Sequence, residues 1–196
     1  MFTLVKRALD IFLSTIGILV CLPFFPVVAL FIKLDSKGPI FFKQERCGMN
    51  NKSFRIIKFR SMQHDAEKIT GPVWSQKGDP RITKVGNIIR KLRIDEIPQM
   101  YNVLRGEMSL VGPRPERPFF VEKLSEQIPY YKRRLKVRPG ITGWAQVKHK
   151  YDESIEDVKI KLRYDLFYIE NMSLRMDFKI LFRTVFVVLF ARGHYN

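Results

Sequence analysis

The chain has 196 residues, which is enough for one domain with a hydrophobic core. Its 35 Lys and Arg residues against 19 Asp and Glu residues give a formal net charge of +16, which favours a polyanionic partner: a phosphorylated substrate, an anionic lipid or a nucleic acid. The two cysteines lack metal-ligand spacing and do not indicate a disulfide framework, and the three histidines are far apart in the sequence.

Residues 1–38 are predicted to form a membrane element. An uncharged run of 22 residues, from 11 to 32, is long enough to cross a bilayer. Pro23 and Pro26 interrupt this run, and proline bends or breaks a helix. Basic residues flank both ends, and the positive-inside preference keeps such ends in the cytoplasm. The pattern favours a re-entrant helical hairpin broken at Pro23, with a proline-kinked spanning anchor as the alternative. The flanking basic residues are Lys6, Arg7, Lys33 and Lys37.

Residues 39–196 are predicted to form one domain on the cytoplasmic face, and this domain begins with a β-hairpin. Residues 40–46 and 54–60 are rich in strand formers, and the segment between them has a turn-type composition. Period-2 alternation brings Lys58 and Arg60 to the same side of the second strand. These two cations could contact a phosphate, or they could form an ordinary solvated strand face.

Two adjacent carboxylates, Asp95 and Glu96, lie at the centre of a strongly basic stretch from 90 to 118. Helical spacing of the apolar residues and the position of Pro98 predict a short helix, with Asp95 at or near its N-cap and Gly106 just past its end. A helix N-terminus and nearby arginines both favour anions. The basic residues of the stretch are Arg90, Lys91, Arg93, Arg105, Arg114 and Arg117.

Arg114 lies between two prolines, Pro113 and Pro115, which restrict the backbone on either side of it. A stiff loop around a single arginine suits anion recognition better than packing. The stretch is therefore a candidate site of phosphoryl chemistry, although surface helices also commonly begin with acidic residues.

The C-terminal third is predicted to be helical. Helices are expected over 119–127 and 130–135, and the second contains the basic run 132–134, which is typical of a solvated face or of an anionic-lipid contact. Ser154 and Asp157 form a capping-box pattern before a further helix. The last helix, 174–190, has the composition of an amphipathic helix at a membrane interface, with burial against the domain as the alternative. The expected fold is α+β and predominantly helical, with a re-entrant membrane helix, interfacial amphipathic helices and a small β-hairpin.

Seven motifs follow one another along nearly the whole chain. They are Lys6-Arg7-x-x-Asp10, Gly38-Pro39-Ile40-Phe41-Phe42-Lys43-Gln44-Glu45-Arg46, Lys58-Phe59-Arg60-Ser61-Met62, Asp79-Pro80-Arg81, Asp95-Glu96-x-Pro98-Gln99-x-x-Asn102-Val103-Leu104, Met108-Ser109-Leu110-Val111-Gly112-Pro113-Arg114-Pro115 and Arg138-Pro139-Gly140-Ile141-Thr142-Gly143-Trp144. In this order they resemble the bacterial sugar transferases, specifically the small monotopic phosphoglycosyl transferases. That family often has Ser-Pro at the break of the membrane helix, where this chain has Leu22-Pro23.

The resemblance implies an enzyme of the bacterial inner membrane that transfers a sugar-1-phosphate from a UDP-sugar to polyprenyl (undecaprenyl) phosphate and releases UMP. This would be the first membrane step of a surface glycoconjugate pathway. By match, Asp95 is the nucleophile that forms a covalent phosphosugar intermediate, and Glu96 helps to hold Mg²⁺. The positions expected to bind substrate phosphates are Arg90, Arg114, Lys58, Arg60 and Arg138.

Two other classes of function account for part of the sequence. A non-enzymatic membrane-surface adaptor explains the charge and the apolar ends but not the arginines around Asp95 and Glu96. A nucleic-acid binder is compatible with the net charge, but the chain has no recognised nucleic-acid motif, and we expect no nucleic-acid partner. The sequence leaves open which sugar is carried and whether the chain forms a homodimer.

Overall fold

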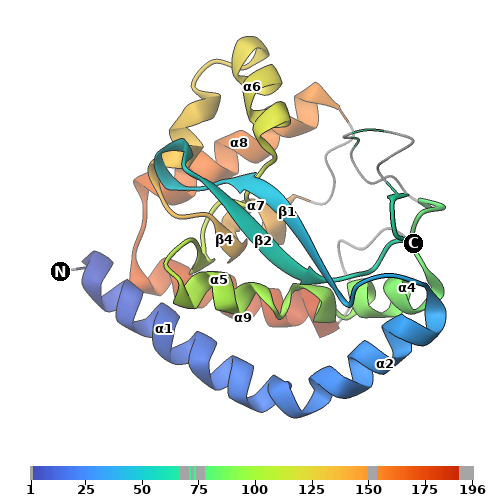
Figure 1. Cartoon of the computed structure of the whole chain (residues 1–196). Helices are drawn as coiled ribbons and strands as arrows, with labels where there is room; N and C mark the ends of the chain where they lie inside the picture. Colours follow the sequence, from blue (N-terminus) through green and yellow to red (C-terminus); the bar gives the residue numbers. More distant parts are fainter. Residues whose placement is uncertain (1, 67–70, 72, 74–77, 150–153, 190–196) are drawn as a thin grey trace.

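A computed structural model of the chain describes residues 2–66, 71, 73, 78–149 and 154–189 (Figure 1). The fold is predominantly helical with a small β-hairpin, as predicted. The helices are α1 (Phe2–Cys21), α2 (Phe25–Asp35), α4 (Lys84–Lys91), α5 (Gln99–Leu104), α6 (Pro118–Gln127), α7 (Trp144–Lys148), α8 (Ile155–Glu170) and α9 (Leu174–Leu189). The strands are β1 (Phe41–Cys47), β2 (Ser53–Phe59), β3 (Ser109–Val111) and β4 (Gly140–Thr142). Four 3₁₀ turns complete the described elements: η1 (Leu22–Phe24), η2 (Met49–Asn51), η3 (Ile94–Glu96) and η4 (Tyr131–Lys136).

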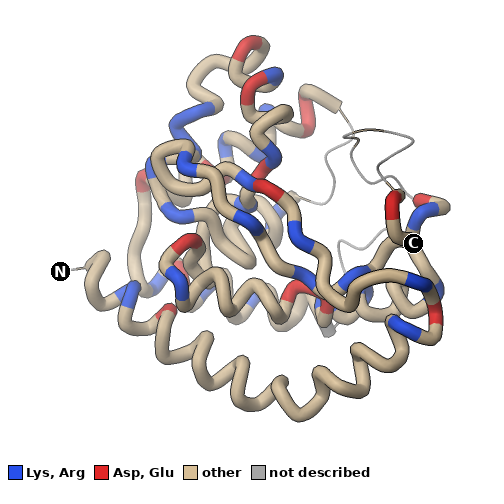
Figure 2. Tube along the Cα trace, viewed as in Figure 1, with Lys and Arg blue, Asp and Glu red and all other residues tan. Residues whose placement is uncertain are grey.

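The N-terminal segment is a bent pair of helices. The turn η1 contains Pro23 and separates α1 from α2 at the predicted break. Figure 1 shows the two helices as a wide V beneath the rest of the chain, and Figure 2 shows that Lys, Arg, Asp and Glu lie only toward its two ends. By length and composition, Phe2–Asp35 is apolar enough to cross a membrane, and only 6% of its most apolar window is buried.

Both arms of the V are anchored to the same domain. On α1, Lys6 Nζ lies 2.6 Å from Asp177 Oδ2, and Arg7 Nη1 donates to the Val103 carbonyl at 2.7 Å. On α2, Asp35 accepts a hydrogen bond from the Val85 backbone N–H. A straight helix of this length would hold its ends roughly 50 Å apart, at about 1.5 Å per residue. The bend lets both ends meet one domain, as the predicted hairpin requires.

The domain contains two small sheets, each with two strands. Strands β1 and β2 pair antiparallel, with Lys43 opposite Ile57, which confirms the predicted hairpin. Strands β3 and β4 pair in parallel and were not predicted, because three residues are too few to show an alternating pattern. A Cβ added to Gly140 would lie 2.1 Å from the Gly112 backbone nitrogen, so glycine is needed for this close approach.

The C-terminal helices cover the sheets. Ser154 and Asp157 form the predicted capping box at the start of α8. The expected helix over 130–135 is the 3₁₀ turn η4 instead. Its Arg134 is not part of a solvated face, because only 3% of it is exposed and it pairs with Asp165. A buried cluster that includes Val103, Met108, Trp144, Tyr168 and Ile180 joins α5, β3, α7, α8 and α9.

Candidate active site

A left-handed residue starts the turn that carries the two carboxylates. After α4, Arg93 has φ +57°, and the chain then winds through η3 into α5. Asp95 therefore lies within a 3₁₀ turn and not at the N-cap of α5, a position that Pro98 occupies. The backbone N–H groups of Glu96 and Ile97 donate to the carbonyls three residues earlier, of Arg93 and Ile94, so this stretch forms a 3₁₀ turn before α5. Gly106, with φ +81°, follows α5 as predicted.

Three cations converge on one oxygen of Glu96. Arg114 Nη2 lies 2.6 Å from Glu96 Oε1, Lys58 Nζ lies 3.3 Å away and Arg93 Nη1 lies 3.8 Å away. Burial alone would raise the pKa of Glu96, but the charges of these cations and the hydrogen bond from Arg114 hold that pKa well below its usual range. Glu96 is therefore ionised and already neutralised within the protein.

Asp95 has a different environment. It is 7% exposed, and its Oδ1 atom is buried without a hydrogen-bond partner among the described residues. Burial and the neighbouring charge of Glu96 raise the pKa of Asp95, while Lys58, Arg90 and Arg114 oppose this rise. The environment thus separates two adjacent carboxylates into a paired anchor and a group with an uncommitted oxygen, which is a common arrangement in catalytic pairs.

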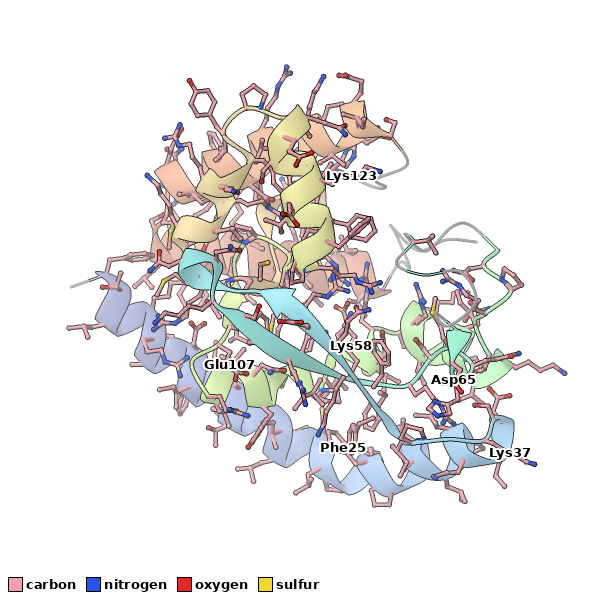
Figure 3. All side chains as sticks on the ribbon, turned by 45° about the horizontal axis from the view of Figure 1, so that its top comes forward. Phe25, Lys37, Lys58, Asp65, Glu107 and Lys123 are labelled. Atoms are coloured by element: carbon pink, nitrogen blue, oxygen red, sulfur yellow. The ribbon has the colours of Figure 1, made fainter. Side chains whose placement is uncertain are left out.

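Lys58 on β2 donates to Glu96 Oε1, and Figure 3 labels Lys58 beside the hairpin. Burial lowers the pKa of Lys58 to about 8, although the charge of Glu96 opposes this shift. At neutral pH the ammonium group is therefore charged but close to its titration range. Arg90, in the last turn of α4, interacts electrostatically with Asp95 and favours its ionised form. Lys58, Arg90 and Arg114 come together at the carboxylates, as predicted.

The backbone around Arg114 is held by hydrogen bonds to successive carbonyls. Arg134 donates to the carbonyl of Arg114 at 2.8 Å, and Arg46 donates to that of Pro115 at 3.2 Å. The Gly140 N–H donates to the Pro113 carbonyl. The flanking prolines have no N–H group of their own to hold the backbone here. The position of Arg114 therefore depends on donors from residues that are distant in sequence.

Two predicted phosphate ligands are placed elsewhere. Arg60 caps the end of α2 by donating to the carbonyls of Ile32, Ser36 and Lys37. Arg138 Nε donates to the Gly106 carbonyl, at the opposite end of α5 from the carboxylates. Among the described residues, neither arginine contacts Asp95 or Glu96. Backbone carbonyls hold both guanidinium groups, so the structure does not bring them to the carboxylate pair, and their role in phosphate binding stays a prediction.

Gln99 is a site residue that the sequence argument did not single out. It follows Asp95 by four residues, is 1% exposed, and its Nε2 atom is buried without a partner among the described residues. The adjoining segments η3 and α5 thus each carry one buried polar atom without a partner among the described residues. The only available signal was the presence of an amide in the motif after Asp95.

The described residues contain no group of three or more His, Cys, Asp or Glu side chains that could hold a metal ion. They do offer the uncommitted Oδ1 of Asp95 and the neighbouring carboxylate of Glu96. Magnesium in phosphoryl-transfer sites is commonly bound by one or two carboxylates together with the phosphates of the substrate. The carboxylate pair therefore fits Mg²⁺ that is held partly by substrate.

Comparison with known proteins identifies the family of this chain. The chain matches the bacterial sugar transferase family over residues 1–191. It is 47% identical to a UDP-N-acetylgalactosamine-undecaprenyl-phosphate N-acetylgalactosaminephosphotransferase of Aeromonas hydrophila, over 98% of this chain and 45% of the relative. It is 44% identical to the exopolysaccharide production protein PSS of Rhizobium leguminosarum bv. phaseoli, over 92% of each chain.

A third relative is the UDP-glucose:undecaprenyl-phosphate glucose-1-phosphate transferase of Escherichia coli (strain K12), which is 44% identical over 93% of this chain and 40% of the relative. The chain belongs to the bacterial sugar transferase family. It spans less than half the length of the Aeromonas and Escherichia relatives.

Proposed function

We propose that this chain is a phosphoglycosyl transferase that moves a sugar-1-phosphate from a UDP-sugar to undecaprenyl phosphate and releases UMP. The observation that carries the proposal is the uncommitted buried oxygen of Asp95 beside Glu96, whose charge is already neutralised by Arg114 and Lys58. Two relatives are named for transfer between a UDP-sugar and undecaprenyl phosphate, which supports the same reaction here.

In the first step, a carboxylate oxygen of Asp95 attacks the phosphorus that bears the sugar. A bond from this oxygen to phosphorus forms, and the bond from phosphorus to the bridging oxygen breaks, so that UMP leaves with the electron pair. In the second step, a phosphate oxygen of the lipid attacks the same phosphorus, and the carboxylate of Asp95 leaves unchanged. A carboxylate nucleophile divides one difficult displacement into two easier ones.

The basic residues lower the repulsion between Asp95 and the diphosphate. Arg114, Lys58 and Arg90 surround the pair, and phosphoryl transfer depends mainly on such charge neutralisation and on positioning. Gln99 can donate to a phosphoryl oxygen through its unpaired Nε2. Glu96 would help to hold Mg²⁺ together with the phosphates of the substrate. The ion, when bound, neutralises charge on the diphosphate.

The V of α1 and α2 provides the membrane placement. Its uncharged bend enters the bilayer from the cytoplasmic face, and its two anchored ends keep the domain at that face. On α9, Phe178, Phe182 and Phe186 are exposed, and we assign this helix to the membrane interface. This placement lets a lipid-soluble acceptor and a water-soluble nucleotide sugar reach one site.

The test is UMP release from a panel of UDP-sugars by the full chain, with undecaprenyl phosphate and Mg²⁺ present. Release is expected with at least one sugar, and it should require the lipid phosphate. A non-enzymatic membrane adaptor would release no UMP with any sugar while still partitioning into vesicles. The panel includes UDP-N-acetylgalactosamine and UDP-glucose, because both sugars occur in the names of the relatives.

A further inference from the structure

Three basic side chains surround Trp144, outside the carboxylate site. Lys148 Nζ lies 5.1 Å from the centre of the indole ring, Lys179 Nζ lies 5.4 Å away and Arg183 Cζ lies 5.4 Å away. We call these four residues the tryptophan cluster. Lys148 and Lys179 are exposed, and Trp144 is 8% exposed. The main charges acting on Asp95 and Glu96 come from other residues.

No ion pair neutralises the cluster within the described part of the chain. The three basic side chains contact the indole, and none of them contacts a carboxylate of the described residues. Other basic side chains of this protein do have such partners, as Lys161 has in Glu116 and Arg134 has in Asp165. Cations held together around one ring repel each other. An anion that reaches all three would remove this repulsion.

The position of the cluster on α9 indicates the source of the anion. At 100° per residue, Leu174 and Leu181 share one side of α9, where they line a pocket together with Leu9 and Leu13 of α1. The exposed residues Phe178, Phe182, Val185 and Phe186 form the next face of the helix. Lys179 and Arg183 follow on the far edge of that face. The cations thus border an exposed apolar surface that begins beside the N-terminal helix.

We infer that the tryptophan cluster binds the phosphate of an anionic phospholipid headgroup and thereby fixes α9 at the membrane surface. An exposed apolar face bordered by basic residues matches the boundary between acyl chains and headgroups. The cluster carries three positive charges with no recorded carboxylate partner, so it favours a lipid with net negative charge over a zwitterionic one. This inference rests on the membrane placement of the proposed function, but it does not depend on transferase activity.

The test uses the emission of Trp144 in the full chain carrying Trp74→Phe, which leaves one of the two tryptophans. The protein in nonionic detergent micelles is titrated with dioctanoyl-phosphatidylglycerol. We expect a saturable change in emission, and we expect the K148Q/K179Q/R183Q variant to bind at least tenfold more weakly, because each basic residue near a membrane surface contributes about fivefold. If that variant does not fold, K148Q alone changes an exposed side chain and should bind about fivefold more weakly.

The matched control, K52Q/K123Q/K132Q, removes the same charge from exposed lysines of the hairpin turn, α6 and η4. Figure 3 labels Lys123 on α6. We expect this control to bind phosphatidylglycerol within twofold of the parent. Equal weakening of both triple variants would overturn the inference, because it would show a non-specific charge effect. Equal affinity for dioctanoyl-phosphatidylcholine, or saturation by inorganic phosphate at the same concentration, would also overturn it.

Discussion

At the scale of single residues, the site depends on how differently Asp95 and Glu96 are surrounded. Arg114 and Lys58 hold the Glu96 carboxylate, while Asp95 Oδ1 remains without a partner among the described residues. The sequence identified the carboxylate pair and three of its cations. It could not show that the cations form their ion pairs with Glu96, because this depends on which carboxylate oxygen each cation reaches in the fold.

The Glu96→Gln variant tests this division of roles. Burial and the charge of Glu96 both raise the pKa of Asp95, so removal of that charge should lower this pKa. Because Asp95 must be ionised to attack, the acid limb of the pH–rate profile should move to lower pH. We also expect turnover to fall on the order of a hundredfold, since Arg114 and Lys58 lose their partner. An acid limb that stays in place would contradict the electrostatic coupling.

The position of Lys58 beside Glu96 predicts a change in substrate binding at alkaline pH. Its pKa is lowered to about 8 by burial, so the ammonium group is charged below pH 8 and loses its charge as the pH rises through that value. The KM for the UDP-sugar should therefore increase above pH 8. Lys58→Arg keeps the charge throughout this range and should abolish the increase. If the increase persists in the arginine variant, another group is responsible for it.

Arg114 tests the geometry of anion recognition. Its Nη2 binds Glu96, and the carbonyls of its own residue and of Pro115 are fixed by Arg134 and Arg46. Arg114→Lys keeps the charge but loses the planar fork, so kcat/KM should fall at least tenfold. Arg117→Lys is the matched control on the same segment and should leave kcat/KM within about twofold. Equal effects of the two substitutions would argue against a specific role for Arg114.

Arg60 was predicted to lie near a phosphate from strand alternation, and Arg138 only from the resemblance to the family. Both lie in basic motifs, and alternation places Arg60 on the same side of the strand as Lys58. In the structure both guanidinium groups donate to backbone carbonyls at helix ends. A helix end leaves carbonyls unpaired, and the sequence does not show which distant arginine will satisfy them.

At the scale of elements, local signals predicted best where one segment supplies the whole pattern. The capping box of α8, the break at Pro23 and the β-hairpin are all contained in short stretches. The parallel pair β3–β4 joins residues some 30 positions apart through three-residue strands, so neither strand carries a usable pattern. The anchoring of α1 to α9 is equally non-local.

The Lys6–Asp177 pair tests that anchoring. Both side chains are 10% exposed and 2.6 Å apart, and Lys6 also donates to the Val111 carbonyl. Lys6→Met leaves a buried carboxylate without its cation, which should lower the free energy of unfolding by about 3 kcal/mol. Thermal or denaturant unfolding of the full chain in detergent measures this change.

Lys159→Met is the control for the buried pair, because Lys159 forms an exposed ion pair with Glu156. Its loss should change the free energy of unfolding by less than about 1 kcal/mol. The double variant Lys6→Met/Asp177→Asn should recover part of the stability lost in Lys6→Met, since no unpaired charge remains. Similar losses for Lys6→Met and Lys159→Met would show that the buried pair does not anchor α1.

At the scale of the whole molecule, the fold brings together an apolar surface, a carboxylate pair and a group of cations. The V of α1 and α2 supplies the apolar surface, η3 supplies Asp95 and Glu96, and β2, α4 and the Arg114 segment supply the cations. Figure 1 shows the V beneath α4 and α5, the helices on either side of η3. The order of motifs in the sequence predicted the family and the parts of this assembly. Their convergence follows from contacts between distant segments, which no single stretch reveals.

In the proposed mechanism, Asp95 carries the phosphosugar between donor and acceptor. Intact-protein mass spectrometry after incubation with the accepted UDP-sugar and Mg²⁺, without lipid phosphate, measures this directly. We predict an added mass of one sugar phosphate that maps to Asp95, is absent in Asp95→Asn and disappears when undecaprenyl phosphate is added. UMP release without any adduct, or an adduct that persists in Asp95→Asn, would contradict the account.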